Sequence, residues 1–345
     1  MGFQNWIRSS CDFGTSRSST SKAGFRFEPP GARVLHRRYR AFRLEPSQFG
    51  TAIDAQFAGP ARRVRFCSSG VSRVRSTSKR TGQCFVPRNG RGDQRNTRHG
   101  PGTYTSLTQV AADVLCISMD RVRMEIGDTR FPPAPAHGGS VTMASLGNAV
   151  HRACEGARQH ALATAGYSNS DADLADVMRR IGRSIENTAD FAPDEATARI
   201  YSMHQYGAVC VEVTADPDLG LVRVPRITGA YAVGRIVNPL MARSQAIGGM
   251  VFGIGMALLE HTRIDARNGR VVNGTLAEYL VPVNADVHGL DVVLIDDPDS
   301  LVNPLGVKGI AELTTIGVAS AIANAVYHAT GTRIRDLPIT PEKLL

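Results

Sequence analysis

A single carboxylate stands at the end of a glycine-rich turn, where the chain passes from Gly306 through Gly309 to Glu312. An apolar helical pattern begins just after it, at residues 316–326. Glycines let a bulky reactant approach the backbone, and a carboxylate held there is suited to accept a proton from that reactant. The structural alternative is that the helix dipole favours acidic residues in the first turn of any helix. The sequence makes Glu312 the candidate catalytic base.

Three further loops combine glycines with small polar side chains, at residues 99–105, 137–142 and 244–249. Glycine-rich loops at helix starts leave backbone N–H groups free to bind phosphate, and the hydroxyl groups of Ser140 and Thr142 add further donors. Tight turns and close helix packing would explain each loop when it is taken alone. The loops indicate a binding site only when they are taken together, in their order along the chain. Helices and strands must then bring them to one place.

Apolar periodicity predicts those elements from residue 101 onward. Helical spacing predicts helices at 105–115, 145–165, 171–181, 242–259 and 316–326, and alternation predicts strands at 122–126, 208–214, 221–227, 279–282 and 291–295. The strands at 208–214 and 221–227 are predicted to form a hairpin. The apolar run from 246 to 259 is too short to cross a bilayer and is predicted to be a buried helix. Helices mixed with hairpins, without regular βαβ alternation, predict the α+β class.

Charge divides the chain into two unlike parts. Residues 1–100 contain 20 Lys and Arg against 5 acidic residues, whereas residues 101–345 contain 20 against 26. Residues 1–98 also lack sustained periodicity, so we expect them to form an irregular basic leader, with the folded domain at 99–345. A basic leader is compatible with nucleic-acid binding, although its arginines follow no recognition motif and that function is disfavoured. The six cysteines show no metal-ligand spacing.

Several motifs occur in a fixed order from residue 100 to the chain end. They are GPGTYT at 100–105, GDT at 127–129, GGS at 138–140, NP at 238–239, RSQAIGG at 243–249, NPLGVKG at 303–309 and RDLPITPEK at 335–343. In this combination they resemble the molybdenum-binding large subunit of the xanthine dehydrogenase and aldehyde oxidase family. The similarity is greatest to the bacterial aldehyde-oxidoreductase branch, and it covers about residues 99–345.

The resemblance implies a fold, a cofactor and a reaction. It implies the molybdopterin-binding domain of the molybdenum hydroxylase fold, and a molybdopterin cofactor, usually the cytosine dinucleotide form, whose dithiolene holds the molybdenum. It implies that Glu312 is the base in a water-derived hydroxylation of an aldehyde or aromatic heterocycle, with hydride transfer to a sulfido ligand of molybdenum. The cofactor-binding residues that it implies are Gly102, Thr103, Gly139, Ser140, Val141, Thr142, Gln245, Lys308 and Gly309.

The same resemblance places the chain in a complex. Electrons would leave through partner iron–sulfur and FAD subunits, and this chain would hold neither an iron–sulfur cluster nor FAD. The substrate stays open, because the substrate channel of the family draws on parts absent here. The compartment also stays open: no signal peptide is recognisable in the sequence, and such complexes occur in the cytoplasm or, carried by the signal of another subunit, in the periplasm. A carboxylate in a dry, glycine-lined pocket would have a raised pKa, while Lys308, four residues earlier, would act in the opposite direction.

Two substitutions and one missing region distinguish this chain from the family pattern. Pro101 stands where some members have a cofactor-binding glutamine, and Ala311 replaces the commoner glycine before the base. Family members have several hundred further residues upstream, and none of them is recognisable here. The alternative to an enzyme fragment is therefore a non-catalytic remnant of the subunit, and we expect the chain by itself not to turn over substrate.

The join near residue 98 suggests a reading-frame origin for the leader. Codons for Arg98-His99-Gly100 are CGN-CAY-GGN; read one base along, and with the first base of the Pro101 codon included, they become GNC-AYG-GNC, which can spell Asp-Met-Gly. The family favours that tripeptide directly before the motif at 100–105. We therefore hypothesise that residues 1–98 are an out-of-frame translation, which inspection of the gene tests.

Overall fold

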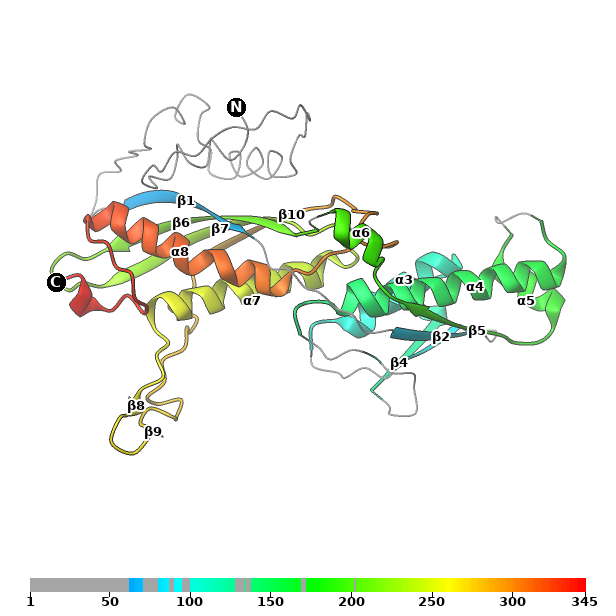
Figure 1. Cartoon of the computed structure of the whole chain (residues 1–345), viewed down its shortest axis with the longest axis horizontal. Coiled ribbons are helices and arrows are strands. Elements are labelled where there is room, and N and C mark those ends of the chain that lie inside the picture. The colour runs from blue at the N-terminus through cyan, green and yellow to red at the C-terminus, as the bar shows by residue number, and fades with distance from the viewer. Residues whose placement is uncertain are drawn as a thin grey trace, which may run out of the picture.

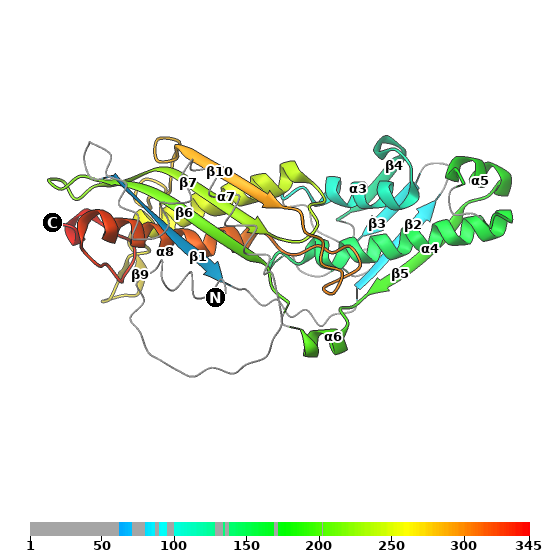
Figure 2. The ribbon, with the colours of Figure 1, turned by 90° about the horizontal axis from the view of Figure 1, so that it is seen from above.

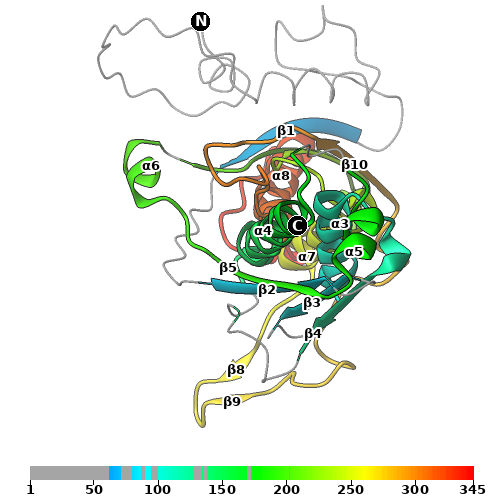
Figure 3. The ribbon, with the colours of Figure 1, turned by 90° about the vertical axis from the view of Figure 1, so that its right-hand side faces the viewer.

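The computed structural model describes residues 62–70, 80–86, 90–94, 100–127, 134, 138–168, 172–201 and 203–345. These residues form two lobes that lie end to end along the long axis of the molecule (Figure 1). Each lobe combines one four-stranded sheet with packed helices. Viewed along the long axis, the two sheets lie on opposite sides and the main helices lie between them (Figure 3). The predicted α+β class is confirmed.

The first lobe is built on the sheet with strand order β4-β3-β2-β5. Its strands are β4 (Val122–Ile126), β3 (Gly90–Gln94), β2 (Arg80–Val86) and β5 (Ile185–Phe191). Its helices are α3 (Thr103–Leu115), the short η2 (Met119–Arg121), the π-helical turn η3 (Met143–Gly147), α4 (Asn148–Ala165) and α5 (Leu174–Ile181). Leu107, Leu146 and Val177 are fully buried in the core between the helices and the sheet.

The second lobe is built on the sheet with strand order β1-β6-β7-β10. Its strands are β1 (Arg62–Gly70), β6 (Tyr206–Ala215), β7 (Val222–Ala232) and β10 (Gly289–Ile295). Its helices are α7 (Pro239–Leu258), α8 (Ala311–Thr330) and the short η4 (Pro341–Lys343), while α6 (Glu195–Ile200) precedes β6. The small hairpin of β8 (Ile264–Asp265) and β9 (Arg270–Val271) projects from the body (Figure 1).

Helices α7 and α8 cross at two glycines of α7. A Cβ atom on Gly249 would collide with the hydroxyl of Thr314, and one on Gly253 would collide with the side chain of Val318. The glycines are four residues apart, as are Thr314 and Val318, so one face of each helix meets the other. Seen from above, both helices lie beneath strands β6 and β7 (Figure 2). This close crossing determines where the first turn of α8 lies relative to the start of α7.

The predicted elements are largely confirmed. The helices predicted at 105–115, 145–165, 171–181, 242–259 and 316–326 correspond to α3, η3 with α4, α5, α7 and α8. The strand at 122–126 and the hairpin at 208–227 are confirmed as β4 and as β6 with β7. Pairing of β3 with β4 and of β7 with β10 is parallel, which the sequence pattern did not indicate.

Three expectations were wrong. Residues 279–282 form no strand, because Tyr279 closes a turn onto Thr275 and Pro282 has no N–H to donate. Within the leader, residues 62–70, 80–86 and 90–94 form β1, β2 and β3 and complete both sheets. The rest of 1–98 lies outside the described residues. Helix α7 is buried on one side only, since Phe252 and Met256 are 64% and 45% exposed.

No helix in the described ranges combines the length and the apolar character needed to cross a bilayer.

Candidate functional site

The turn that leads to Glu312 is held by the side chain of Asn303. Its amide donates to the carbonyl of Val307 at 2.8 Å and accepts from the Val307 N–H at 3.2 Å. Gly306, at φ 66°, occupies the left-handed region that glycine adopts without strain. The turn also pairs with the end of β7, because Gly234 and Val307 form an isolated antiparallel bridge. The backbone before the candidate base is therefore fixed by several hydrogen bonds.

Ser140 brings the glycine-rich loop of the first lobe onto this turn. Its Oγ accepts hydrogen bonds from the N–H groups of Ile310 at 2.9 Å and Ala311 at 3.4 Å. Gly309 permits this approach, because a Cβ atom there would lie 2.9 Å from the Ser140 Cβ. Two loops that are about half the chain apart in sequence thus meet at the start of α8.

Gln245 and Lys308 line one cavity of about 100 Å³ at the junction of the lobes. The other lining residues come from residues 101–106 around the start of α3, from η3, from the segment that joins β7 to α7, from α7 and from the residue before α8; they include Pro101, Met143, Val237, Met241 and Ile310. Within the part of the chain that the structure describes, no residue hydrogen-bonds the side-chain amide of Gln245. That amide is therefore available to a ligand in the cavity.

Lys308 is held by two groups of the second lobe. Its ammonium lies 2.7 Å from the carboxylate of Asp299 and donates to the backbone carbonyl of His204 at 3.1 Å. The side chains of the pair are only 13% and 29% exposed, so removing one partner would leave a poorly solvated charge on the other. The Lys308 charge is therefore compensated by Asp299.

Glu312 lies in the first turn of α8 and its side chain is exposed. The expectation of a dry, glycine-lined pocket around it is wrong for the described residues. Ile310, two residues before Glu312, lines the cavity together with Gln245. The Glu312 side chain itself is open to solvent. The structure thus places the candidate base at the edge of the junction.

The remaining predicted site residues fall into two groups. Gly139, Val141 and Thr142 flank Ser140 in the loop that contacts α8. Gly102 caps α3 at φ 84°, and a Cβ atom there would lie 3.2 Å from the Cβ of Met241, which lines the cavity. Thr103 begins α3 and does not line the cavity. Asp128, Thr129 and His137, which contribute to the family likeness, lie outside the described residues.

Two residues that the sequence did not single out join the lobes. Asn148 is fully buried, and its side-chain oxygen accepts a hydrogen bond from the Leu305 N–H at 3.0 Å. Arg235 forms an ion pair with Asp113 of α3 at 3.0 Å. A signal existed for Asn148, since it is a lone amide among the small apolar residues at the start of α4, where an unsatisfied polar group would be costly.

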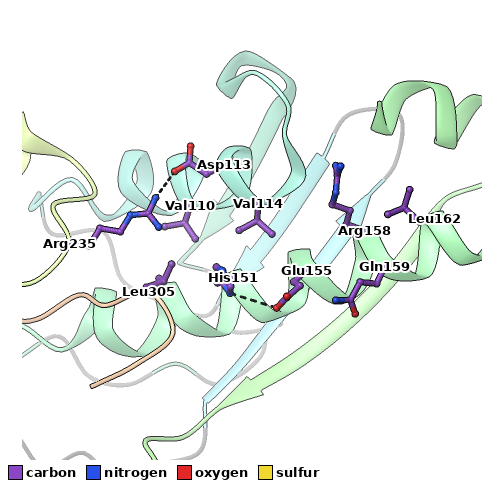
Figure 4. Close-up of a pocket in the computed structure, with 10 residues that line it drawn as sticks. All are labelled: Val110, Asp113, Val114, His151, Glu155, Arg158, Gln159, Leu162, Arg235 and Leu305. Atoms are coloured by element: carbon purple, nitrogen blue, oxygen red, sulfur yellow. Dashed lines mark hydrogen bonds and ion pairs between the residues drawn. The ribbon is translucent and has the colours of Figure 1, made fainter. Parts of the chain in front are cut away.

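A larger cavity of about 420 Å³ lies between α3 and α4 (Figure 4). Val110, Val114 and Leu162 supply apolar surface, and Arg235 lines this cavity as well as the smaller one. His151 lies 4.0 Å from Glu155, and its Nδ1 is buried without a hydrogen-bond partner. Burial lowers the pKa of His151 below its ordinary value of 6.5, and the nearby Glu155 opposes that shift. No group of three or more potential metal-ligating side chains occurs in the described residues.

His151 should make folding stability depend on pH. Because its pKa is lowered in the folded chain, the unfolded chain binds the proton more readily, and stability falls as the pH drops below the ordinary value of 6.5. We expect His151→Gln to flatten the pH dependence of the urea midpoint over about pH 5–7.5. His160→Gln, on the exposed side of the same helix, serves as the control. An unchanged slope in His151→Gln would contradict this account.

Comparison with known proteins identifies the class to which this fold and junction belong. A family model described as a molybdopterin cofactor-binding domain matches residues 95–288. The chain belongs to this molybdopterin cofactor-binding family. The match begins just before the motif at 100–105 and spans the Ser140 loop, β6, β7 and α7.

Individual relatives narrow the class further. The chain is 37% identical over 262 residues to the aldehyde oxidoreductase molybdenum-binding subunit PaoC of Escherichia coli K12, covering 71% of this chain and 35% of PaoC. It is 42% identical over 141 residues to the putative xanthine dehydrogenase molybdenum-binding subunit XdhA of the same strain, covering 40% of this chain and 18% of XdhA. These matches confirm the resemblance to molybdenum-binding subunits of this family. The chain spans about a third of the length of PaoC.

Solved structures confirm the fold. The aldehyde oxidoreductase from Desulfovibrio gigas superposes with a TM-score of 0.71 at 24% identity, over 90% of this chain and 34% of that protein. Quinoline 2-oxidoreductase from Pseudomonas putida 86 superposes with a TM-score of 0.68 at 22% identity, over 91% of this chain and 43% of that protein. The two-lobed arrangement is therefore that of molybdenum hydroxylases.

Proposed function

We propose that this chain is the C-terminal part of a molybdenum hydroxylase catalytic subunit, which oxidises an aldehyde or an aromatic heterocycle. One observation carries the proposal: the Ser140 loop, Gln245, Lys308 and the start of α8 meet at a single junction between the lobes. Ordinary packing would not require glycine-rich loops from distant parts of the chain to converge beside a carboxylate and an unpaired amide.

The residues at the junction fit the polar edge of a molybdopterin. The Gln245 amide provides both a donor and an acceptor to the cavity. Gly138 borders open space, since a Cβ atom there would meet nothing within 4 Å, so a ligand can approach the backbone beside Ser140. We propose that Gly139, Val141 and Thr142 contact the cofactor through the same loop. Lys308 would act as a fixed positive charge near it, although Asp299 compensates that charge.

A cytosine dinucleotide form is longer than the pterin alone and would need a second space. Arg235 lines both cavities, so the small cavity beside Gln245 and the larger one between α3 and α4 have this side chain in common. We propose that the nucleotide part extends past Arg235 toward the larger cavity. Its phosphates would be attracted by Arg235, whose guanidinium is half exposed at the ion pair with Asp113.

The chemistry divides between the cofactor and the chain. When bound, the cofactor supplies the redox centre that accepts electrons from the substrate. Glu312 takes up the proton released as a water-derived oxygen is added to the substrate carbon. The exposed position of Glu312 then requires a cover that excludes water, because a carboxylate in bulk solvent is a weak base at neutral pH.

Exposed apolar side chains of the second lobe support a larger assembly. Leu240, Phe252 and Met256 of α7 are 77%, 64% and 45% exposed. Phe252 and Met256 lie one turn apart on the same side of the helix, and Leu240 lies in its first turn. Apolar surface of this kind usually marks a contact with another protein region. We propose that the remaining part of the large subunit covers it, and that iron–sulfur and FAD subunits complete the electron path.

Molybdenum content tests the proposal on the chain itself. Purified from a host that makes the cofactor, the chain should retain molybdenum and should release CMP on acid hydrolysis. Gln245→Leu should lower the retained molybdenum about tenfold, because a hydrogen bond to the cofactor is lost. Ser244→Ala, one residue away on the exposed side of α7, should retain it fully.

The alternative outcome is equally clear. If the chain holds no more molybdenum than Gln245→Leu does, it is a non-catalytic remnant that can at most bind partner subunits. Retained molybdenum without released CMP would leave the cofactor class intact and would exclude the cytosine dinucleotide form.

A further inference from the structure

Helix α8 begins without a cap of its own. Its N-cap residue, Ile310, has φ −128° and ψ −47° and offers no side-chain hydrogen bond. The first N–H groups of a helix have no partner within the helix, and an uncapped start frays. Here the cap is supplied by Ser140, 170 residues away in the other lobe. The candidate base Glu312 lies in the turn that this cap orders.

The backbone of Ser140 is held in a costly conformation to make this contact. Its φ of 53° lies in the left-handed region, which a residue with a Cβ atom rarely adopts. Glycine would occupy that conformation more easily, and glycines already stand at 138 and 139. Serine is therefore strained at this position relative to glycine. What it adds to glycine is one methylene and the hydroxyl group, and the hydroxyl group makes the contact with α8.

The hydrogen-bonding capacity of the Ser140 hydroxyl is only partly used. A hydroxyl has two acceptor lone pairs and one O–H donor. Both bonds to α8 use its acceptor capacity, since the N–H groups of Ile310 and Ala311 donate to Oγ. Within the described ranges, no residue accepts the Ser140 proton. The O–H therefore remains available to an acceptor on the ligand side of the junction.

We infer that Ser140 is a positioning residue that fixes where α8 begins, and thereby where Glu312 stands, by capping the helix from the opposite lobe. The catalytic role of this cap rests on the proposed function, in which Glu312 is the base. The Ser140 O–H can donate to an acceptor group, such as a cofactor phosphate oxygen, while the Oγ atom caps α8. Binding of that acceptor is thereby linked to the order of the first turn of α8. Its role goes beyond that of a simple cofactor contact.

Hydrogen exchange of the full chain tests the cap directly. In Ser140→Ala we expect the amides of residues 310–314 to exchange about fivefold to tenfold faster than in the parent, because the cap is lost. Residues 320–330, in the distal half of the same helix, should keep their exchange rates. Ser145→Ala is the matched control, since its Oγ donates to Val141 within its own segment and does not reach α8.

Ser140→Gly separates the cap from the backbone strain. Glycine relieves the positive φ but also lacks the hydroxyl, so the exchange at 310–314 should stay fast while the melting temperature recovers relative to Ser140→Ala. This variant also keeps the test valid if Ser140→Ala folds poorly. Unchanged exchange at 310–314 in Ser140→Gly would overturn the inference.

A kinetic measurement distinguishes positioning from cofactor binding. In a complex supplied with its missing parts, Ser140→Ala should lower kcat per bound molybdenum, while KM stays near the parent value. Loss of molybdenum in proportion to activity would instead assign Ser140 to cofactor binding alone. If Glu312 proves unimportant for turnover, the proposed function fails, whereas the exchange result still decides whether Ser140 caps α8.

Discussion

Replacing Glu312 with Gln should lower kcat for aldehyde oxidation about 10²–10⁴-fold, which is the usual contribution of a positioned general base. The amide has nearly the same shape as the carboxylate but cannot accept the proton. Because the described chain leaves Glu312 exposed at the edge of the junction, the measurement requires a complex in which the rest of the large subunit and its redox partners are supplied. Steady-state kinetics with an aromatic aldehyde then gives kcat directly.

Molybdenum content and a second carboxylate provide the controls. Glu312→Gln should retain molybdenum at the parent level, since the proposed cofactor contacts come from Gln245 and the Ser140 loop. Glu195→Gln changes an exposed carboxylate of α6 that lines neither cavity, and it should leave kcat unchanged. If Glu312→Gln keeps more than a tenth of the parent kcat at full molybdenum content, Glu312 is not the base.

The turn before Glu312 and the helix after it could be predicted from the sequence, because glycine positions and apolar spacing are local features of the chain. Glycines at 306 and 309, together with the helix pattern after them, indicate a turn followed by a helix. The structure agrees, and Gly306 does have a positive φ. The assignment of Gln245 and Lys308 to the same region relied on the family resemblance. Both residues line one cavity, because α7 and the turn before α8 are neighbours in the second lobe, and their role in cofactor binding stays a prediction.

The contacts between the lobes could not be predicted, since they depend on tertiary packing. Nothing local indicates that Ser140 would cap a helix 170 residues away, or that Asn148 would hold the Leu305 backbone. The exposure of Glu312 was missed for a related reason. A glycine-rich turn predicts that a ligand can approach, but burial of the carboxylate depends on what packs over it.

Within the leader, apolar periodicity did not predict the strands that the structure shows. β2 and β3 are short and carry glycines at 82, 90 and 92, so they lack the regular alternation from which strands are predicted. They pair with β4 and β5 in the first lobe, which supplies the partners that a local pattern cannot reveal. The reading-frame hypothesis remains a prediction. It fails if no single-base shift upstream of codon 99 restores a family-like sequence.

Gly249→Ala should destabilise the chain by about 1–3 kcal/mol, the usual cost of forcing one extra methyl group into a tightly packed contact. The new Cβ would meet the Thr314 hydroxyl, and it would lie 3.1 Å from the carbonyl oxygen of Ala311. That hydroxyl donates to the same carbonyl at 2.7 Å, so the substitution also disturbs a hydrogen bond of the first turn of α8. Urea unfolding followed by circular dichroism measures the loss.

The neighbouring glycine provides an opposite expectation in the same helix. Gly248 is exposed, and a Cβ atom there would meet nothing within 4 Å. Gly248→Ala should therefore raise stability by about 0.5–1 kcal/mol through the better helix propensity of alanine. Opposite signs at adjacent positions would show that the crossing of α7 and α8, and not helix propensity, requires glycine at 249. If both substitutions stabilise, the helices are not in close contact there, and the first turn of α8 is not fixed against α7.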